Sequence, residues 1–209
     1  MSENSERFYT TSFQVRGRKI SNLFSAMMAT HNSALTAMKI LDTERLTLSL
    51  ISLDDANFYL ELVNDPTWIE NIRDMGIHTV EAASESISNT QIASQNRDGF
   101  SFYLVRRQVD NAPMGMCGLK KRDFLNDVDL GYAFLPRFAG HGYALEAATA
   151  VVQYARANLH LPKLAAITSQ SNDRSNHLLK KLRFNLEQVL VLPGEERFTN
   201  LYGLVLTPD

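Results

Sequence analysis

The chain has 209 residues, of which 44% are hydrophobic, and this length predicts one domain with a sizeable core plus an extension. The formal net charge is −2, so no general positive field points to a nucleic-acid partner. The single cysteine, Cys117, excludes an internal disulfide and a multi-cysteine zinc site, and its apolar neighbours predict a buried core residue. No apolar run reaches the roughly 18 residues of a membrane-spanning helix, so we expect no membrane partner.

Residues 1–40 are interpreted as an N-terminal extension, because they are rich in Ser, Thr and Asn and carry more basic than acidic residues. We expect either a flexible leader or a start codon that was assigned upstream of the true start at Met38. Part of this segment, such as residues 20–30, could instead form a helix. A targeting peptide is disfavoured by Glu3 and Glu6 and by the lack of an apolar segment with a cleavage site. We therefore expect a cytoplasmic protein whose folded domain spans 41–209.

From Leu41 onward, hydrophobic periodicity predicts alternating strands and helices. The first half contains a strand over 45–51, a helix that starts at 52–55 and ends at Asn64-Asp65-Pro66, a short helix or turn over 68–73, and a helix over 80–93 capped by Thr79. Strands over 100–106, 114–121 and 127–135 then form an antiparallel meander, with a hairpin turn over 110–113.

Pro136 ends the third strand of the meander, and a long amphipathic helix follows a glycine-containing loop. Leu145, Ala148, Val152 and Leu159 mark the apolar face of that helix. A strand over 163–169, a helix over 173–182 and a final hairpin of strands over 186–192 and 200–206 complete the chain. These elements predict an α/β (α+β) fold, with a mixed, mostly antiparallel sheet of about six or seven strands and helices on both faces.

The loop of residues 137–142 (Arg-Phe-Ala-Gly-His-Gly) lies between the end of a strand and the start of a helix. Gly140 and Gly142 permit positive φ and a close approach of a ligand to the backbone. The first amides of the following helix have no intrahelical acceptor and lie at the positive end of its dipole. Arg137 and His141 can add charge or hydrogen bonds around an anion. The pattern therefore predicts a site for a diphosphate.

Two glycines also occur in ordinary turns, so this loop is a weak signal by itself. A dinucleotide-binding fingerprint would need a small residue where the chain has Leu145, and a P-loop would need Lys and Ser or Thr where Tyr143 and Ala144 follow Gly142. Both of these common phosphate-binding motifs are excluded.

The order of motifs resembles the GNAT superfamily of acyl-CoA N-acyltransferases, and most closely its branch that acetylates ribosomal-protein N-termini. The matching stretches are 130–136, 140–147, 172–184, and 64–66 with 72–76. The resemblance covers roughly Leu41 to Leu206. It implies the GNAT fold and acetyl-CoA as co-substrate, with no metal.

The resemblance also implies residues that bind the co-substrate. Loop amides would hold the pyrophosphate, and the strand before the loop would pair its backbone with the pantetheine arm. Asn172 would contact the same arm, although Asn is also a common helix cap. The loop residues are Phe138, Ala139, Gly140, His141, Gly142, Tyr143 and Ala144, and the strand residues are Ala133, Phe134 and Leu135.

The reaction needs removal of a proton from the amine and protonation of the departing thiolate. Many relatives carry a Tyr seven residues after the Asn as the acid and a Glu five residues before it as the base, where this chain has Leu179 and Ile167. The ribosomal-protein branch has a Ser three residues after the Asn, which makes Ser175 the candidate acid.

Glu146, one turn into the helix after the loop, is the second candidate catalytic residue. It could orient a water molecule, and the alternative is a structural role at the start of the helix. Asp129 and His177 are weaker candidates. The wall of the acceptor site maps to the early loops, at Trp68, Ile72, Arg73 and Asp74. Arg183 occupies a position where relatives have a glycine, so a local adjustment is expected there.

We therefore expect an N-acetyltransferase that moves an acetyl group from acetyl-CoA to a primary amine, either a protein N-terminus or a small molecule. A non-catalytic acyl-CoA-binding regulatory module is the alternative, and a nucleotide-binding protein is a weaker third reading. The sequence leaves a monomer and a homodimer equally open.

Overall fold

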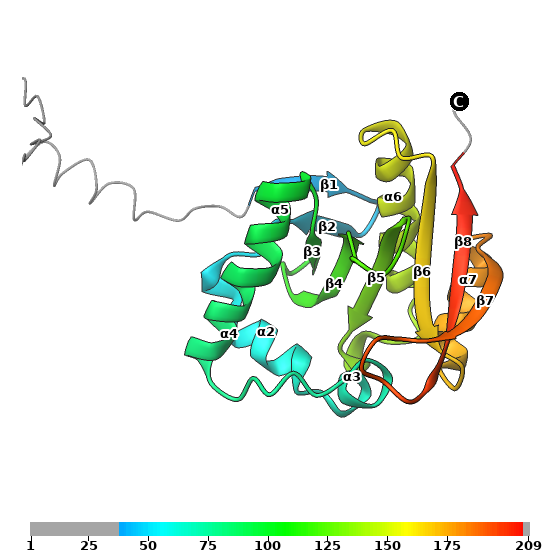
Figure 1. Ribbon diagram of the computed structural model, residues 1–209. Coiled ribbons are helices and arrows are strands. Elements are labelled where there is room, and N and C mark those ends of the chain that lie inside the picture. Colours follow the sequence, from blue (N-terminus) through cyan, green and yellow to red (C-terminus); the bar gives the residue numbers. More distant parts are fainter. Residues whose placement is uncertain (1–37, 207–209) are drawn as a thin grey trace, which may run out of the picture. The chain divides into compact units, whose positions relative to one another are not determined.

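One eight-stranded sheet organises residues 38–206, the part of the chain that the computed structural model describes (Figure 1). Residues 1–37 and 207–209 lie outside the described residues, and so does the helix expected over 20–30. The first strand starts at Lys39, close to the expected start of the domain. Among the described residues, no helix combines the length and apolarity needed to cross a bilayer.

The sheet has the strand order β1-β2-β3-β4-β5-β6-β8-β7. Every neighbouring pair is antiparallel except β5–β6, which is parallel. The strands are β1 (Lys39–Asp42), β2 (Leu46–Ser49), β3 (Phe102–Arg107), β4 (Pro113–Lys120), β5 (Val128–Phe134), β6 (Lys163–Ser169), β7 (Asn185–Val191) and β8 (Phe198–Val205).

The seven expected strands, the meander β3–β4–β5 and the final hairpin β7–β8 are confirmed. The expected strand count was one too low, because β1 was missed. That strand has only four residues and shows no alternation of polar and apolar side chains, so its sequence gave no period-two signal.

Within residues 38–206, six α-helices accompany the sheet: α2 (Ala56–Val63), α3 (Pro66–Asn71), α4 (Val80–Ile87), α5 (Ala93–Asp98), α6 (Tyr143–Ala157) and α7 (Asp173–Lys181). The helix expected over 80–93 continues to Asp98, because a π-helical turn over Ser88–Ile92 joins α4 to α5. Thr79 caps α4 as expected, with its side chain accepting a hydrogen bond from the amide of Ala82 at 3.1 Å.

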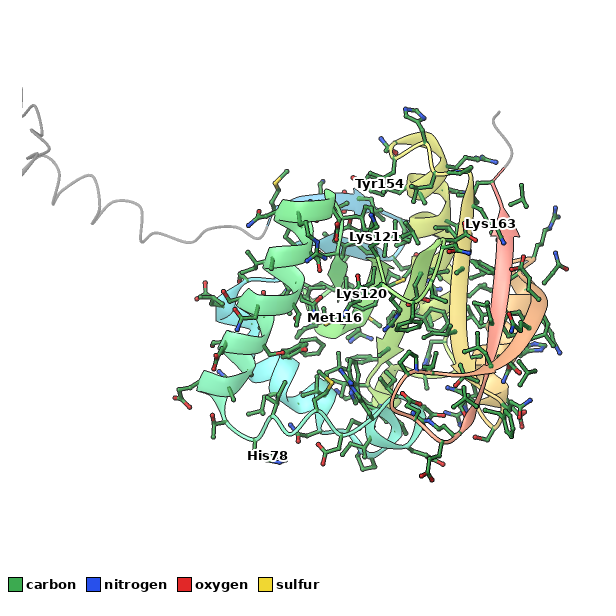
Figure 2. All side chains as sticks on the ribbon, viewed as in Figure 1. His78, Met116, Lys120, Lys121, Tyr154 and Lys163 are labelled. Atoms are coloured by element: carbon green, nitrogen blue, oxygen red, sulfur yellow. The ribbon has the colours of Figure 1, made fainter. Side chains whose placement is uncertain are left out.

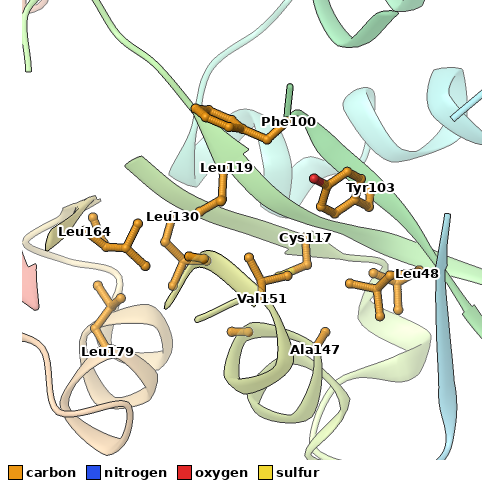
Figure 3. Packing of buried hydrophobic residues seen from close by; sticks show 14 of the residues in the cluster. Leu48, Phe100, Tyr103, Cys117, Leu119, Leu130, Ala147, Val151, Leu164 and Leu179 are labelled. Atoms are coloured by element: carbon orange, nitrogen blue, oxygen red, sulfur yellow. The ribbon is translucent and has the colours of Figure 1, made fainter. Parts of the chain in front are cut away.

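Two apolar layers hold the sheet between the helices. The larger layer packs α6 and α7 against one face, and Figure 3 shows Cys117, Leu130, Val151 and Leu179 within it. The second layer packs α2 and α4 against the opposite face. Burial raises the pKa of the Cys117 thiol, so this cysteine is the inert core residue expected.

Arg183 follows α7 with a φ of 67°, a left-handed conformation that glycine adopts more easily. The local adjustment expected at this position is thus a strained backbone, which costs about 1–2 kcal/mol for a residue with a Cβ.

Candidate active site

The sheet opens between its two parallel strands. β5 and β6 pair only through Val128–Leu164 and Asp129–Ala165, although β5 continues to Phe134 and β6 to Ser169. Figure 1 shows the two strands diverging toward their carboxyl ends. The backbone of β5 beyond residue 129 therefore lacks a strand partner on this side.

The backbone groups that face this gap follow from the register of β5 against β4. The amide of Leu135 donates to the carbonyl of Met114 on β4, at 3.0 Å. Backbone groups of an antiparallel strand alternate in direction, so Leu130, Tyr132 and Phe134 turn their amides and carbonyls toward the gap. A ligand with amide groups can hydrogen-bond there as an added strand.

A set of free amides follows the gap, where β5 leads through Pro136 into α6. The amides of Phe138 and Ala139 are used within a short 3₁₀ turn, donating to Leu135 and Pro136. Within the described chain, the amides from Gly140 to Leu145 have no such acceptor. Gly140 and Gly142 have φ values of 80° and 81°, which confirms the expected positive φ.

Glu146 and Arg45 brace this loop. The Glu146 carboxylate accepts hydrogen bonds from Thr43 Oγ1 at 2.6 Å, from the Arg45 amide at 2.9 Å and from Arg45 Nε at 2.7 Å. Arg45 also donates to the carbonyl of His141 at 3.2 Å and lies over the ring of Tyr143, 4.5 Å from its centre. The carboxylate thus anchors an arginine that contacts the loop at two points.

Burial alone would raise the pKa of Glu146, but the hydrogen bonds from Thr43 and Arg45 outweigh it and lower the pKa below its ordinary value. A carboxylate with a lowered pKa is a poor proton acceptor. Arg137, the other charge expected near the anion, pairs with Glu61 of α2.

The free amides make the loop sensitive to a methyl group at Gly140. A Cβ there would meet no atom within 4 Å, so Gly140→Ala should act through its positive φ and through the loss of close ligand approach. We expect the KM for acetyl-CoA to rise about tenfold, equivalent to about 1.4 kcal/mol, in steady-state assays of thiol release.

The matched control is Gly99→Ala, at a φ of 79° and also with no neighbour within 4 Å, where α5 ends. It should cost the same backbone strain and leave this KM unchanged. Equal changes in KM from both variants would show that the loop does not bind the co-substrate.

A cavity of about 480 Å³ runs through the gap in the sheet. It is lined from one side by Ser175 and Leu179 of α7, and from the other by residues of α3, α4–α5 and the β7–β8 loop. Its size is in the range of small-molecule sites. Trp68, Ile72 and Arg73 line it as the sequence predicted for an acceptor wall, whereas Glu146 and Asp74 do not.

Ser175 lies in the cavity as part of a hydrogen-bonded pair. Its hydroxyl is 2.9 Å from the hydroxyl of Tyr132 on β5. Its amide donates to Asn172 Oδ1 at 3.0 Å, so Asn172 caps α7 and keeps its side-chain amide donors free. Burial raises the pKa of Tyr132, which keeps its hydroxyl protonated. The Tyr132–Ser175 pair therefore offers a proton donor beside the gap, although this chain has Leu179 at the position where relatives carry the acidic Tyr.

Asp129 lines the same cavity, at the vertex where β5 and β6 part. It is 1% exposed, and its Oδ2 accepts from Arg122 Nε at 2.7 Å. Its Oδ1 is buried and has no hydrogen-bond partner among the described residues. Burial raises the pKa of this carboxyl, and Arg122, the backbone amide of Ile167 and the charge of Lys120 oppose the rise. Asp129 is thus a buried cavity carboxylate with only one oxygen held by an ion pair.

The sequence did not indicate the importance of two cavity residues, Tyr132 and Asp129. Tyr132 alternates with Leu130 and Phe134 on the apolar face of β5, so the pattern indicated core packing. Asp129 was only a weak candidate from the sequence. Its burial depends on the point where β5 and β6 part, and no local sequence motif predicts that point. Leu179 and Ile167 line the cavity as apolar walls, and His177 is exposed on α7 and does not line it.

Comparison with known proteins identifies the class of this architecture. The family model described as an acetyltransferase (GNAT) domain matches residues 45–185. The uncharacterized N-acetyltransferase YoaA of Bacillus subtilis is 27% identical over 175 residues, which cover 79% of this chain and 96% of that protein.

Solved structures show the same fold. The acetyltransferase of Agrobacterium tumefaciens aligns with a TM-score of 0.67 at 21% identity, over 83% of this chain and 97% of that one. RimL, a ribosomal L7/L12 α-N-protein acetyltransferase solved with coenzyme A, aligns with a TM-score of 0.70 at 19% identity, over 82% and 99%.

Proposed function

Because the chain belongs to the GNAT family of acetyltransferases, we propose that it transfers an acetyl group from acetyl-CoA directly to a primary amine, either a peptide N-terminus or a small molecule. The observation that carries the proposal is one cavity that brings together a protonated hydroxyl pair and a buried carboxylate. The pair comes from β5 and α7, and the carboxylate stands at the vertex of the gap.

The binding residues fit acetyl-CoA. The free amides from Gly140 to Ala144 suit a pyrophosphate, and the backbone of Tyr132 and Phe134 offers the hydrogen bonds that an amide-bearing arm needs. The free amide of the Asn172 side chain can add another donor. The co-substrate supplies the acetyl thioester. We propose that Glu146 positions Arg45 and the loop.

The chemical roles follow from protonation. Asp129 accepts the proton that the amine must lose, directly or through a water, because its raised pKa makes it a better base than an exposed aspartate. The Tyr132–Ser175 pair donates a hydrogen bond, and then a proton, to the sulfur as the C–S bond breaks, and the proton that Asp129 took from the amine finally replaces it by way of solvent. Holding both substrates in one cavity adds the rate advantage of proximity.

The hydroxyl pair can be tested by single and double replacement. Ser175→Ala and Tyr132→Phe should each lower kcat about 100-fold, the lower end of the usual contribution of a positioned acid, with little change in the KM for acetyl-CoA. If the two hydroxyls act as a unit, the double variant should be no slower than the slower single variant.

The assay is thiol release from acetyl-CoA with a panel of primary amines, with product identity checked by mass spectrometry. Calorimetry with acetyl-CoA supplies the binding control. If acetyl-CoA binds but no amine yields thiol above background, the chain is an acyl-CoA-binding module and not a transferase.

A further inference from the structure

The cavity is basic although the chain is weakly acidic. Its lining includes five basic side chains, from Arg73, Lys120, Lys121, Arg122 and Arg197, and three acidic ones, from Asp123, Asp129 and Glu195. The whole chain has a formal net charge of −2. The positive charge is therefore local to the cavity.

Two of the basic residues are already paired. Arg122 holds Asp129, and Arg197 holds Glu195 at 3.1 Å. Arg197 also donates to the carbonyl of Glu70 at 3.0 Å and to that of Ile72, which ties the β7–β8 loop to the end of α3. These two arginines form part of the cavity wall, and their charges are neutralised by Asp129 and Glu195.

Arg73, Lys120 and Lys121 remain, and within the described residues none of them makes a hydrogen bond or an ion pair. Asp123 is the one acidic lining residue outside the two pairs. Figure 2 labels Lys120 and Lys121 at the end of β4. Lys120 is only partly exposed, and its register partner on β5 is Asp129.

Burial lowers the pKa of Lys120, repulsion from Arg122 and Arg73 lowers it further, and attraction to Asp129 opposes these effects only in part. Arg73 and Lys120 come from different parts of the chain and line the same cavity. Like charges gathered in a cavity are costly unless an anion joins them, and an oxyanion would turn this repulsion into charge-assisted hydrogen bonds.

This cluster is separate from the loop proposed for the pyrophosphate. Lys120 lies opposite Asp129 at the start of β5, and the loop begins after Pro136 at the other end. Seven residues of extended strand span about 23 Å. A single diphosphate held by the amides after Gly140 cannot also neutralise Lys120.

We propose that the acceptor is an anionic amine, a primary amine that also carries a carboxylate or a phosphate, and that Lys120 and Arg73 bind the oxyanion while the amine faces Asp129. The inference rests on the proposed acetyl transfer. It disfavours polyamines, whose additional positive charges would meet the same basic cluster.

The preference can be measured with matched pairs of acceptors that differ in one charged group. Suitable pairs are O-phosphoethanolamine against ethanolamine, 4-aminobutanoate against butylamine, and a Ser-Asp peptide against a Ser-Asn peptide. We expect kcat/KM to be about 10- to 100-fold higher for the anionic member of at least one pair, the usual effect of charged hydrogen bonds. The pair with the largest ratio identifies phosphate, free carboxylate or acidic peptide as the source of the anion.

Lys120→Met and Arg73→Met remove the charges and keep long side chains. Each should lower kcat/KM for the anionic acceptor about 10-fold or more and for its neutral partner less than about twofold. Lys120→Arg should restore most of the preference. The control is Lys180→Met, on the exposed surface of α7 and outside the cavity lining, which should change neither value.

The outcomes separate the two levels of the proposal. Amines could be acetylated with no preference for the anionic member of any pair, or Lys120→Met could slow the reaction of both members equally. Either result would contradict the proposed anionic subsite and leave the proposed acetyl transfer intact. If no amine releases thiol from acetyl-CoA, the proposed function itself fails.

Discussion

Replacement of Asp129 by asparagine is expected to lower kcat about 100- to 1,000-fold, within the range ascribed to a positioned general base. Asparagine has nearly the same shape and keeps an oxygen for Arg122, but it cannot accept the proton of the amine. The loss should be smaller for an acceptor whose amine has a low pKa, because such an amine arrives neutral and needs less help. Steady-state rates across a series of acceptors measure this trend.

The pH dependence supplies a second readout. Because burial raises the pKa of Asp129, the wild-type kcat should fall on the acid side at a higher pH than an ordinary aspartate would give. Below that pKa the carboxyl is protonated and inactive, and above it the base is present. Asp129→Asn should remove this limb, whereas Asp123→Asn, in the same cavity, should keep it. An Asp129→Asn enzyme with wild-type kcat and an unchanged acid limb would rule out the assigned role.

The largest loss of stability is expected from Asn176→Ala. Asn176 Nδ2 donates to the carbonyls of Ser169 and Asn172, at 3.0 and 2.8 Å. Its Oδ1 accepts from Asn200 and from the hydroxyl of Tyr202, at 2.9 and 2.8 Å. The truncation would leave the buried amide of Asn200 and the hydroxyl of Tyr202 without this acceptor and would remove two bonds that hold α7 to the end of β6, so the free energy of unfolding should fall by about 2–4 kcal/mol.

A fall of this size corresponds to roughly 5–15 °C in Tm for a chain of this length, which calorimetry or thermal circular dichroism can measure. His177→Ala is the matched control, because His177 is the next residue of α7 and is exposed. Its Tm should change by no more than about 2 °C. If Asn176→Ala melts like the control, the network does not hold α7 to β6 and β8.

Periodicity and local motifs predicted most of the fold. The long amphipathic pattern of α6, the proline that ends α2 and the hairpin turn before β4 are all local signals, and each element lies where its signal indicated. β1 escaped because its pairing with β2 depends on a partner strand and not on its own four residues. The extension of α4 into α5 depends on a π-helical turn that has no sequence signature.

The co-substrate loop was predictable for the same reason, since glycine before a helix is a local signal. The remaining site was not, because its parts meet only through the sheet. Tyr132 and Ser175 are 43 residues apart and touch because α7 packs on β6, the strand next to β5. Glu146 was expected at the chemistry from its place near the loop, but Thr43 and Arg45, about one hundred residues earlier, occupy its carboxylate.

The two residue pairs that join β5 to β6 have a mechanical consequence. They are the only ladder contacts within the described chain between the half-sheet β1–β5 and the half-sheet formed by β6, β8 and β7. We call the β5–β6 boundary, with its pairs Val128–Leu164 and Asp129–Ala165, the seam of the sheet. A ligand that hydrogen-bonds along the open edge of β5 lies in this seam and contributes further contacts there. Because such a ligand binds only the folded chain, heat resistance should increase with the logarithm of its concentration. With acetyl-CoA as the proposed ligand, the unfolding temperature of the protein should therefore report the concentration of acetyl-CoA around it.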